Sequence, residues 1–237
     1  MTMKRRLKTA ADLDARRIRD NLARVREEVA AACSRAGRGA SEVEILVATK
    51  YVSADGLAVL ADAGIVLIGE NRAQDLVAKH RLYGPRFTWD FIGHLQGNKV
   101  RRVLPLMRLI HSLDSLSVTA EINRHARTRT NVLLEVNVGQ EAGKCGIIPS
   151  EVDRFLEEAA KFPKVNFTGL MTMPPLAANP EVVRPAFAAL RRLASDLSQK
   201  WHGKYSFERL SMGTSQDFAV AVEEGATIIR VGSVLYE

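Results

Sequence analysis

Residues 44–50 read Glu-Ile-Leu-Val-Ala-Thr-Lys, an apolar run that ends in a lysine. The run is short and contains branched apolar residues, so it predicts a buried strand rather than a helix. Ser53 follows as a candidate helix cap, and a helical apolar pattern then continues to a stop at Gly64. The segment predicts one strand-then-helix unit with Lys50 at the carboxyl end of its strand.

The same unit recurs along the rest of the chain. Expected strands cover residues 44–49, 65–68, 87–92, 107–111, 132–138, 165–171, 205–210 and 227–231. Expected helices cover residues 53–63, 73–81, 98–103, 115–127, 149–161, 181–201 and 216–224. Near-continuous apolar strands indicate a parallel sheet covered on both faces. Eight units favour an α/β fold consisting of a single (β/α)₈ TIM barrel. An open Rossmann-like sheet is the alternative, but no strand runs into a GxGxxG or GxxxxGK[ST] segment.

The composition is that of an ordinary globular protein. The chain has 237 residues, of which 46% are hydrophobic and 26% charged, with a formal net charge of +7. This balance excludes a disordered chain, and no stretch reaches the roughly 18 consecutive apolar residues of a membrane span. The basic start is not followed by the apolar core of a signal peptide. Cys33 and Cys145 cannot form a disulfide framework, so we expect reduced thiols and a cytoplasmic location.

Much of the positive charge lies in residues 1–39, which hold eleven Lys/Arg and five Asp/Glu, a net of 11 − 5 = +6. Ile18, Leu22, Val25 and Val29 form an apolar stripe at helical spacing within this segment. We therefore expect a basic N-terminal helix (1–39) packed on the barrel (40–237), in one domain overall. An RNA-binding segment is the alternative, although no aromatic residue lies there to stack on bases.

Functional residues of a barrel gather at the carboxyl ends of its strands. Lys50 follows the first apolar strand, where we expect its amine to be desolvated. Desolvation favours the neutral amine, which is the nucleophile needed for a Schiff base. A lysine that merely reaches from a strand end to water is the alternative interpretation.

Two segments near the carboxyl terminus suit an anion. Gly213-Thr214-Ser215 precedes an expected helix, and Gly232-Ser233 follows the last expected strand. Free N–H groups at a helix start, with hydroxyls beside them, bind phosphate well. Barrels often bind phosphate at the loops after strands seven and eight, where both segments fall. An ordinary N-cap and an ordinary turn are the alternative.

Arg230 lies two residues before Gly232, so its side chain should share that face of the strand. A guanidinium placed against a pyridine nitrogen donates a hydrogen bond and leaves that nitrogen largely unprotonated. An amine, a phosphate site and such an arginine together describe pyridoxal 5′-phosphate (PLP), which uses Asp or Arg partners at its ring nitrogen.

Seven segments resemble one known family. They are VATKYVS (47–53), IGENRAQD (68–75), FIGHLQGNK (91–99), EVNVGQEAGKCGI (135–147), GLMTMPP (169–175), LSMGTSQDF (210–218) and IIRVGSVLYE (228–237). In this order they resemble the pyridoxal phosphate homeostasis proteins, small PLP-binding proteins similar to the N-terminal barrel of alanine racemase. The resemblance spans about residues 7–237.

The resemblance implies PLP on Lys50, a ring contact from Asn71 and an arginine at the ring nitrogen, Arg230. It implies phosphate contacts from the S-M-G-x-S and R-x-G-[ST] segments. The cofactor-binding residues expected in these two segments are Ser211, Gly213, Thr214, Ser215, Gly232 and Ser233. His94 and Lys144 also match family positions, with less defined roles. Two positions depart from the family pattern: Asp90 replaces a common His, and Thr214 replaces a common Met.

The resemblance favours a PLP carrier and regulator over an enzyme. Such a protein holds PLP as a Schiff base and buffers or delivers it, which affects amino-acid and keto-acid metabolism. A low-activity PLP-dependent amino-acid racemase is the nearest alternative. In alanine racemases the second base is a Tyr from a separate C-terminal domain, and we expect this chain, which ends at Glu237, to have no such domain. An aldolase-type Schiff-base barrel is a further alternative.

The expected partners are PLP and apo PLP-dependent enzymes, without a membrane or nucleic acid, for a chain that is a monomer or a weak homodimer. No metal site is expected, because the five histidines show no HxxxH or HExxH spacing and neither cysteine belongs to a CxxC pair.

Overall fold

The computed structural model of the chain describes residues 6–141, 143–175 and 177–237. Its eight strands are all parallel and form a closed barrel in sequence order, β1 to β8. The strands are β1 (Glu44–Ala48), β2 (Leu67–Glu70), β3 (Thr88–Phe91), β4 (Leu109–Leu113), β5 (Thr130–Glu135), β6 (Val165–Met171), β7 (Arg209–Thr214) and β8 (Ile228–Val231). The closed order confirms the predicted (β/α)₈ barrel and excludes the open sheet.

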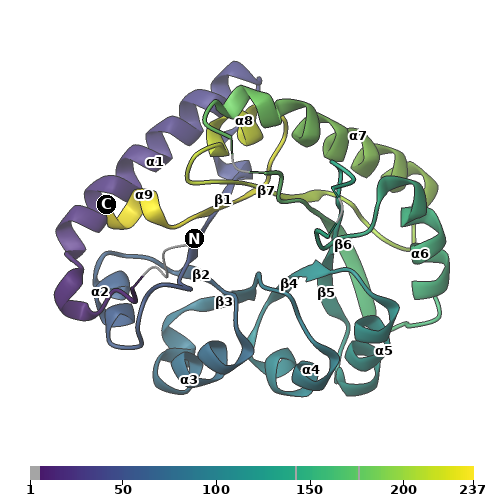
Figure 1. The fold of residues 1–237 in the computed structure, drawn as a ribbon, viewed down its shortest axis with the longest axis horizontal. Helices are drawn as coiled ribbons and strands as arrows, with labels where there is room; N and C mark the ends of the chain where they lie inside the picture. Colours follow the sequence, from purple (N-terminus) through teal and green to yellow (C-terminus); the bar gives the residue numbers. More distant parts are fainter. Residues whose placement is uncertain (1–5, 142, 176) are drawn as a thin grey trace.

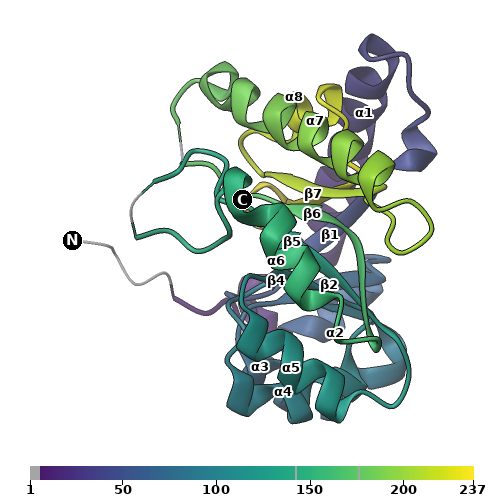
Figure 2. The ribbon, with the colours of Figure 1, turned by 90° about the vertical axis from the view of Figure 1, so that its right-hand side faces the viewer.

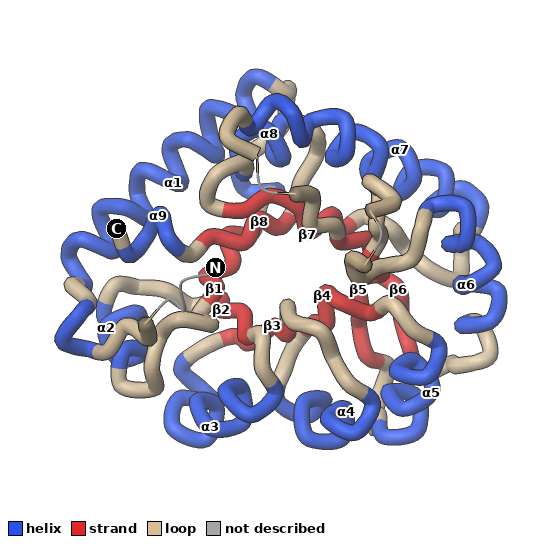
Figure 3. Tube along the Cα trace, in the orientation of Figure 1, coloured by secondary structure: helices blue, strands red, loops and turns tan. Residues whose placement is uncertain are grey.

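Helices surround this ring of strands (Figures 1 and 3). They are α1 (Ala15–Arg35), α2 (Gly56–Asp62), α3 (Ala73–Tyr83), α4 (Gly97–Val103), α5 (Leu116–His125), α6 (Val152–Ala159), α7 (Arg184–Lys200), α8 (Phe218–Glu223) and α9 (Ser233–Tyr236). The main hydrophobic core lies between the strands and the helices, as expected for strands with two covered faces. A smaller apolar cluster fills the barrel itself: Leu46, Leu109, Leu133, Met171 and Ile228.

Helix α1 packs against α8 and α9 (Figure 1). The predicted stripe of Ile18, Leu22, Val25 and Val29 is its buried face. Asp14 caps its start by accepting hydrogen bonds from two backbone N–H groups of the first turn. Residues 1–5 of the predicted segment 1–39 lie outside the described residues, and the division at residues 39 and 40 stays a prediction.

Strand β7 differs from the expectation. The sequence pattern predicts a strand at residues 205–210, but β7 begins at Arg209 and extends to Thr214. Tyr205 is buried against the aromatic rings of Phe167 and Trp201, and Phe207 is buried against Tyr205. Neither residue pairs in the sheet. Burial of aromatic residues between the sheet and the helices therefore produced a strand-like apolar pattern ahead of the true strand.

Within the described residues, no helix is long and apolar enough to cross a membrane. The loops that follow β5 and β6 extend from one end of the barrel (Figure 2). At the opposite end Glu44, the first residue of β1, accepts hydrogen bonds from Arg108 at 2.5 Å and Arg209 at 3.0 Å. These ion pairs join β1 to β7 and to the residue just before β4, at the amino ends of the strands, and leave the carboxyl ends for the site.

Candidate functional site

A cavity of about 670 Å³ opens at the carboxyl ends of β1, β2, β7 and β8. Seven of the nine predicted site residues line it: Lys50, Asn71, Thr214, Ser215, Arg230, Gly232 and Ser233. Ser211 and Gly213 are not among its lining residues and lie in β7. The barrel thus brings together residues from four strands that are up to 183 positions apart, because parallel strands end at the same edge.

Lys50 lies two residues beyond the end of β1 and its side chain is exposed. Its Nζ is 4.9 Å from the centroid of the Tyr51 ring, a cation–π contact. The expected desolvation of this amine is therefore absent from the structure. Lys50 remains a candidate nucleophile because it lines the cavity, not because it is buried.

A buried ion pair supports the backbone just before Lys50. Lys79 of α3 donates to Glu70 Oε1 at 2.5 Å and to the Thr49 carbonyl at 2.9 Å. The Thr49 hydroxyl donates to the same Glu70 oxygen at 2.6 Å. Together these bonds fix the end of β1 against β2 and α3. Sequence reasoning missed this support; its signal is a glutamate at the end of a strand and a lysine nine residues later.

Asn71 carries a buried amide oxygen, Oδ1, with no hydrogen-bond partner among the described residues. Buried acceptors are seldom left unpaired, because losing water without a replacement costs about 1–3 kcal/mol. Asn71 lines the same cavity as Lys50, so a bound molecule with a donor group would satisfy this atom.

Arg230 is almost fully buried at the floor of the cavity. Its Nη1 donates to Ser211 Oγ at 2.5 Å and its Nη2 donates to the Thr172 carbonyl at 3.0 Å. Burial lowers the pKa of Arg230 to about 10, while Glu135 and Asp217 act in the opposite direction. The guanidinium is therefore still charged at neutral pH, and Ser211 of β7 and Thr172, just after β6, hold it in one orientation.

A chain of hydrogen bonds continues from Arg230 through the barrel interior; we call it the interior chain. Ser211 Oγ is 2.8 Å from His111 Nδ1, and His111 Nε2 is 3.1 Å from Asp90 Oδ2. Arg108 then donates two bonds to Asp90, at 2.7 and 3.0 Å. Asp90, which departs from the family pattern, thus has a defined structural role between His111 and Arg108.

The protonation of His111 follows from this arrangement. Burial lowers the pKa of His111 against the raising effect of Asp90, which favours a neutral ring. A neutral ring with its proton on Nε2 donates a hydrogen bond to Asp90 and accepts one from the Ser211 hydroxyl at Nδ1. Ser211 Oγ then accepts from Arg230, and every group in the interior chain has a partner of the right kind.

The loops after β7 and β8 meet at Ser215. Its Oγ accepts hydrogen bonds from the backbone N–H of Gly232 at 3.0 Å and of Val234 at 3.5 Å. Helix α8 begins only at Phe218, so Ser215 does not cap it as the sequence pattern indicated. Ser215 and Ser233 nevertheless line the cavity beside the start of α9, and their hydroxyls are available to an anion there.

Thr214 and Gly213 shape the backbone of the β7 end. The Thr214 N–H and hydroxyl both donate to Asp217 Oδ1, at 2.5 and 3.0 Å. Gly213 has a φ of +90°, and a Cβ there would lie 2.6 Å from the Ala221 Cβ. A side chain is excluded on both grounds, so Gly213 sets the close approach of β7 to α8 rather than lining the cavity.

The structure adds residues that the sequence patterns did not indicate. Lys8 pairs with the loop after β1, since its N–H donates to the Tyr51 carbonyl at 2.7 Å and its carbonyl accepts from Ser53 N–H at 2.9 Å. Arg6 and Lys8 line the cavity and bring positive charge to it. Tyr236 also lines it, and its hydroxyl donates to the Ala48 carbonyl at 3.2 Å.

A second cavity of about 540 Å³ adjoins the first and shares Asn71, Ile92, Met173 and Arg230 with it. His94 and Lys144 line this second cavity. So does Glu135, whose pKa is raised to about 7 by burial and by the nearby charge of Asp114. The mouth of the barrel therefore has two compartments, and Arg230 borders both of them.

Comparisons with known proteins agree with this picture. Residues 13–237 match the family described as "Alanine racemase, N-terminal domain". The pyridoxal phosphate homeostasis protein of Aquifex aeolicus is 41% identical to this chain, over 92% of this chain and 96% of that protein. The pyridoxal phosphate homeostasis protein of Escherichia coli K12 is 32% identical, over 92% of this chain and 95% of that protein.

Solved structures agree as well. PipY from Synechococcus elongatus PCC7942, in a structure with PLP bound, has a TM-score of 0.80 to this chain at 29% identity. That match covers 93% of this chain and all of PipY (100%). An unknown protein from Bifidobacterium adolescentis has a TM-score of 0.85 at 33% identity, over 93% of this chain and 95% of that one.

Proposed function

The chain belongs to the alanine racemase N-terminal domain family and, within it, to the pyridoxal phosphate homeostasis proteins, and from this premise we propose that it binds PLP in intracellular PLP homeostasis. In this proposal Lys50 holds the cofactor as a Schiff base, and the protein buffers or delivers it in the cytoplasm. The observation that carries the proposal is one cavity lined by Lys50, Arg230 and the Ser215–Ser233 hydroxyl pair.

The chemistry of the cavity fits PLP at both ends. When bound, PLP supplies an aldehyde that reacts with amines, and Lys50 is a primary amine exposed at the cavity. The Ser215 and Ser233 hydroxyls supply donors for a phosphate, with Arg6 and Lys8 adding positive charge. The unpartnered Asn71 Oδ1 supports the fit, because a donor on the cofactor side would satisfy it.

Arg230 would fix the orientation of the cofactor ring. Its pKa of about 10 keeps it protonated at neutral pH, so it donates a hydrogen bond without giving up its proton. Ser211 and the Thr172 carbonyl fix the direction of that bond. A ring nitrogen paired with such a donor stays largely unprotonated, and this is the weaker of the two known arrangements for withdrawing electrons.

The visible absorption spectrum of the purified protein tests the Lys50 assignment. We expect a Schiff-base band that sodium borohydride abolishes and that is missing from Lys50→Ala. Lys161→Ala is the matched control, because that lysine is largely exposed near the end of α6. A band that survives unchanged in Lys50→Ala would overturn the role of Lys50.

Delivery requires that PLP leave the protein for an apo PLP-dependent enzyme. The openness of Lys50 to solvent supports this step, since an incoming amine can reach it. We expect the loaded protein to reactivate an apo-enzyme. If hand-over needs contact between the two proteins, a phosphatase that destroys free PLP should slow this reactivation only partly.

We expect a monomer or a weak homodimer by sedimentation at micromolar concentration.

A second function, slow amino-acid racemisation, needs a proton donor and acceptor on each face of the ring. Tyr51 and Tyr236 both line the cavity. Burial and the charge of Glu70 raise the pKa of Tyr236, which makes its phenolate hard to form. Deuterium incorporation at the α-position of an amino acid in D₂O, lost in Lys50→Ala, would favour racemisation.

A further inference from the structure

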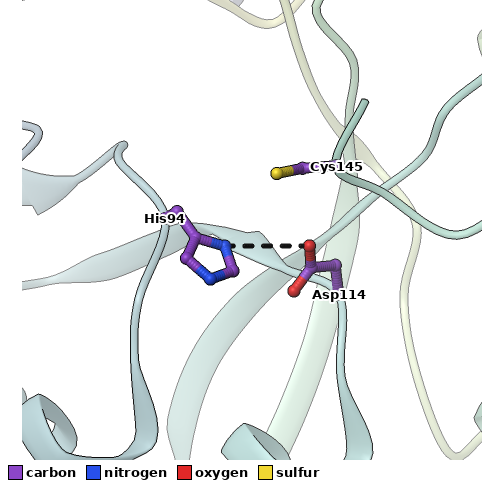
Figure 4. Close-up of side chains that lie close together, drawn as sticks. All are labelled: His94, Asp114 and Cys145. Atoms are coloured by element: carbon purple, nitrogen blue, oxygen red, sulfur yellow. Dashed lines mark ion pairs between the residues drawn. The ribbon is translucent and has the colours of Figure 1, made fainter. Parts of the chain in front are cut away.

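Three side chains from separate loops converge at the mouth of the barrel (Figure 4). His94 follows β3, Asp114 follows β4, and Cys145 lies in the loop after β5. His94 Nδ1 is 3.9 Å from Asp114 Oδ2, and the ligand atoms of all three residues lie within 4.8 Å of one another. We call these three residues the His94 cluster.

We propose that the His94 cluster binds one Zn²⁺ ion, with a fourth coordination position open toward the second cavity. This inference does not depend on the binding of PLP, because none of the three residues lines the cavity at Lys50.

The donor set is the basis of the choice of metal. An imidazole nitrogen, a thiolate and a carboxylate are the three ligand types that Zn²⁺ takes in proteins, whereas Mg²⁺ and Ca²⁺ prefer oxygen alone. Metal–ligand bonds of about 2.0–2.3 Å place tetrahedral ligand atoms about 3.3–3.7 Å apart. The observed separations, all within 4.8 Å, exceed these by about 1.5 Å at most, which side-chain rotation can close. The His94 side chain is 55% exposed and therefore has room to turn.

The loops around the cluster hold two of the three ligands in place. The Gly146 N–H lies 3.4 Å from Asp114 Oδ2 and orients this carboxylate, as outer hydrogen bonds do at metal sites. Gly146 has a φ of +102°, and a Cβ there would lie 2.8 Å from the Asn137 nitrogen. A glycine is therefore required next to Cys145, and it keeps the loop tight against β5.

The local charge suits a cation. Glu135 lines the second cavity together with Cys145, and Asp114 lies beside Cys145 in the cluster, so two carboxyl groups lie close to the site. Lys144, the adjacent cation, is paired with Glu141 at 2.6 Å. A metal ion would place positive charge next to these carboxyl groups.

The open position gives the site a chemical use. His94 and Cys145 line the second cavity, which also contains Arg230 and Glu135. A zinc ion there would hold a water molecule or a small anion beside the compartment that borders the PLP site. The spacing rules for zinc motifs predicted no metal because these ligands come from three loops, 20 and 31 positions apart along the chain.

Co²⁺ and Zn²⁺ binding to the purified, chelator-treated protein tests the inference. We expect one Co²⁺ per chain with a sulfur charge-transfer band and the strong visible bands of tetrahedral cobalt. Zn²⁺ should displace the bound Co²⁺. The affinity for Zn²⁺ is measured by competition with a chelating dye. Cys145→Ser, His94→Gln and Asp114→Asn should each weaken Zn²⁺ binding at least tenfold. His94 is exposed, so His94→Gln is the variant whose folding is least at risk.

Two matched controls separate the cluster from general metal binding. His125→Gln alters another His–carboxylate pair, His125 with Glu121 at 3.2 Å, and should leave Zn²⁺ affinity unchanged. Cys33→Ala removes the other cysteine, which is buried in α1, and should leave the charge-transfer band intact. If His94→Gln binds Zn²⁺ within threefold of the unaltered protein, or if cobalt shows no sulfur band, the inference is wrong.

Discussion

Ser211 lies directly behind Arg230: the Arg230 Nη1 donates to Ser211 Oγ over 2.5 Å, from β8 to β7. Ser211 does not line the cavity, yet it orients the guanidinium that does. The same Ser211 Oγ is 2.8 Å from His111 Nδ1. The predicted contribution of Ser211 to the site is therefore best described as positioning Arg230.

Ser211→Ala should weaken PLP binding about tenfold and lower the free energy of unfolding by about 1–3 kcal/mol, because Arg230 and His111 each lose a buried partner. Absorbance titration with PLP and urea denaturation measure the two effects. Ser195→Ala, on the exposed face of α7, is the control and should change neither quantity. An unchanged PLP affinity in a folded Ser211→Ala protein would contradict the positioning role.

Asp90→Asn should lower the free energy of unfolding by about 2–3 kcal/mol at pH 7, because Arg108 loses its buried carboxylate; the figure allows for the partial exposure of Arg108. Although burial opposes it, hydrogen bonds from His111 and Arg108 lower the pKa of Asp90 below 3.8. A lowered carboxyl pKa stabilises the fold above the unfolded value, and the effect is lost as pH falls through the folded value. The deficit of the variant should therefore shrink in acid; a deficit that grows below pH 4 would contradict this account.

Glu135→Gln should stabilise the metal-free protein at high pH. The folded pKa of Glu135 is raised from 4.5 to about 7, so the unfolded chain loses this proton first as pH rises. Stability conferred by the protonated group is complete below pH 4.5 and is lost as pH rises to about 7. We expect the variant to gain about 2–3 kcal/mol over the unaltered protein at pH 8 and nothing at pH 4. Glu151→Gln, at an exposed position, is the control and should show no such pH dependence.

Lys79→Met should lower the free energy of unfolding by about 3–5 kcal/mol, because the carboxylate of Glu70 stays buried without its cation. The double variant Lys79→Met/Glu70→Gln should recover a large part of this loss, since no buried charge remains. Chemical denaturation of both single variants and the double variant gives the coupling energy. Additive effects of the two substitutions would show that the pair does not act as a unit.

Much of the architecture was predictable because its signals are local. Apolar strands that alternate with helical patterns indicated the barrel, and the chain order of those strands is the order around the ring. Lys50, Asn71, Arg230 and the two hydroxyl segments could be expected at one edge because parallel strands share their carboxyl ends. The sequence pattern misplaced strand β7, because Tyr205 and Phe207 are buried without pairing in the sheet.

The amino-acid sequence by itself determined the fold class and which residues reach the mouth of the barrel, because periodicity and strand ends are short-range properties. Only the tertiary structure decided which side chains meet there. The Arg230–Ser211–His111–Asp90 contacts, the Lys79–Glu70 pair and the His94 cluster join residues from different strands, helices and loops. Such contacts depend on how the closed barrel aligns its strands, and no spacing rule along the chain encodes that alignment.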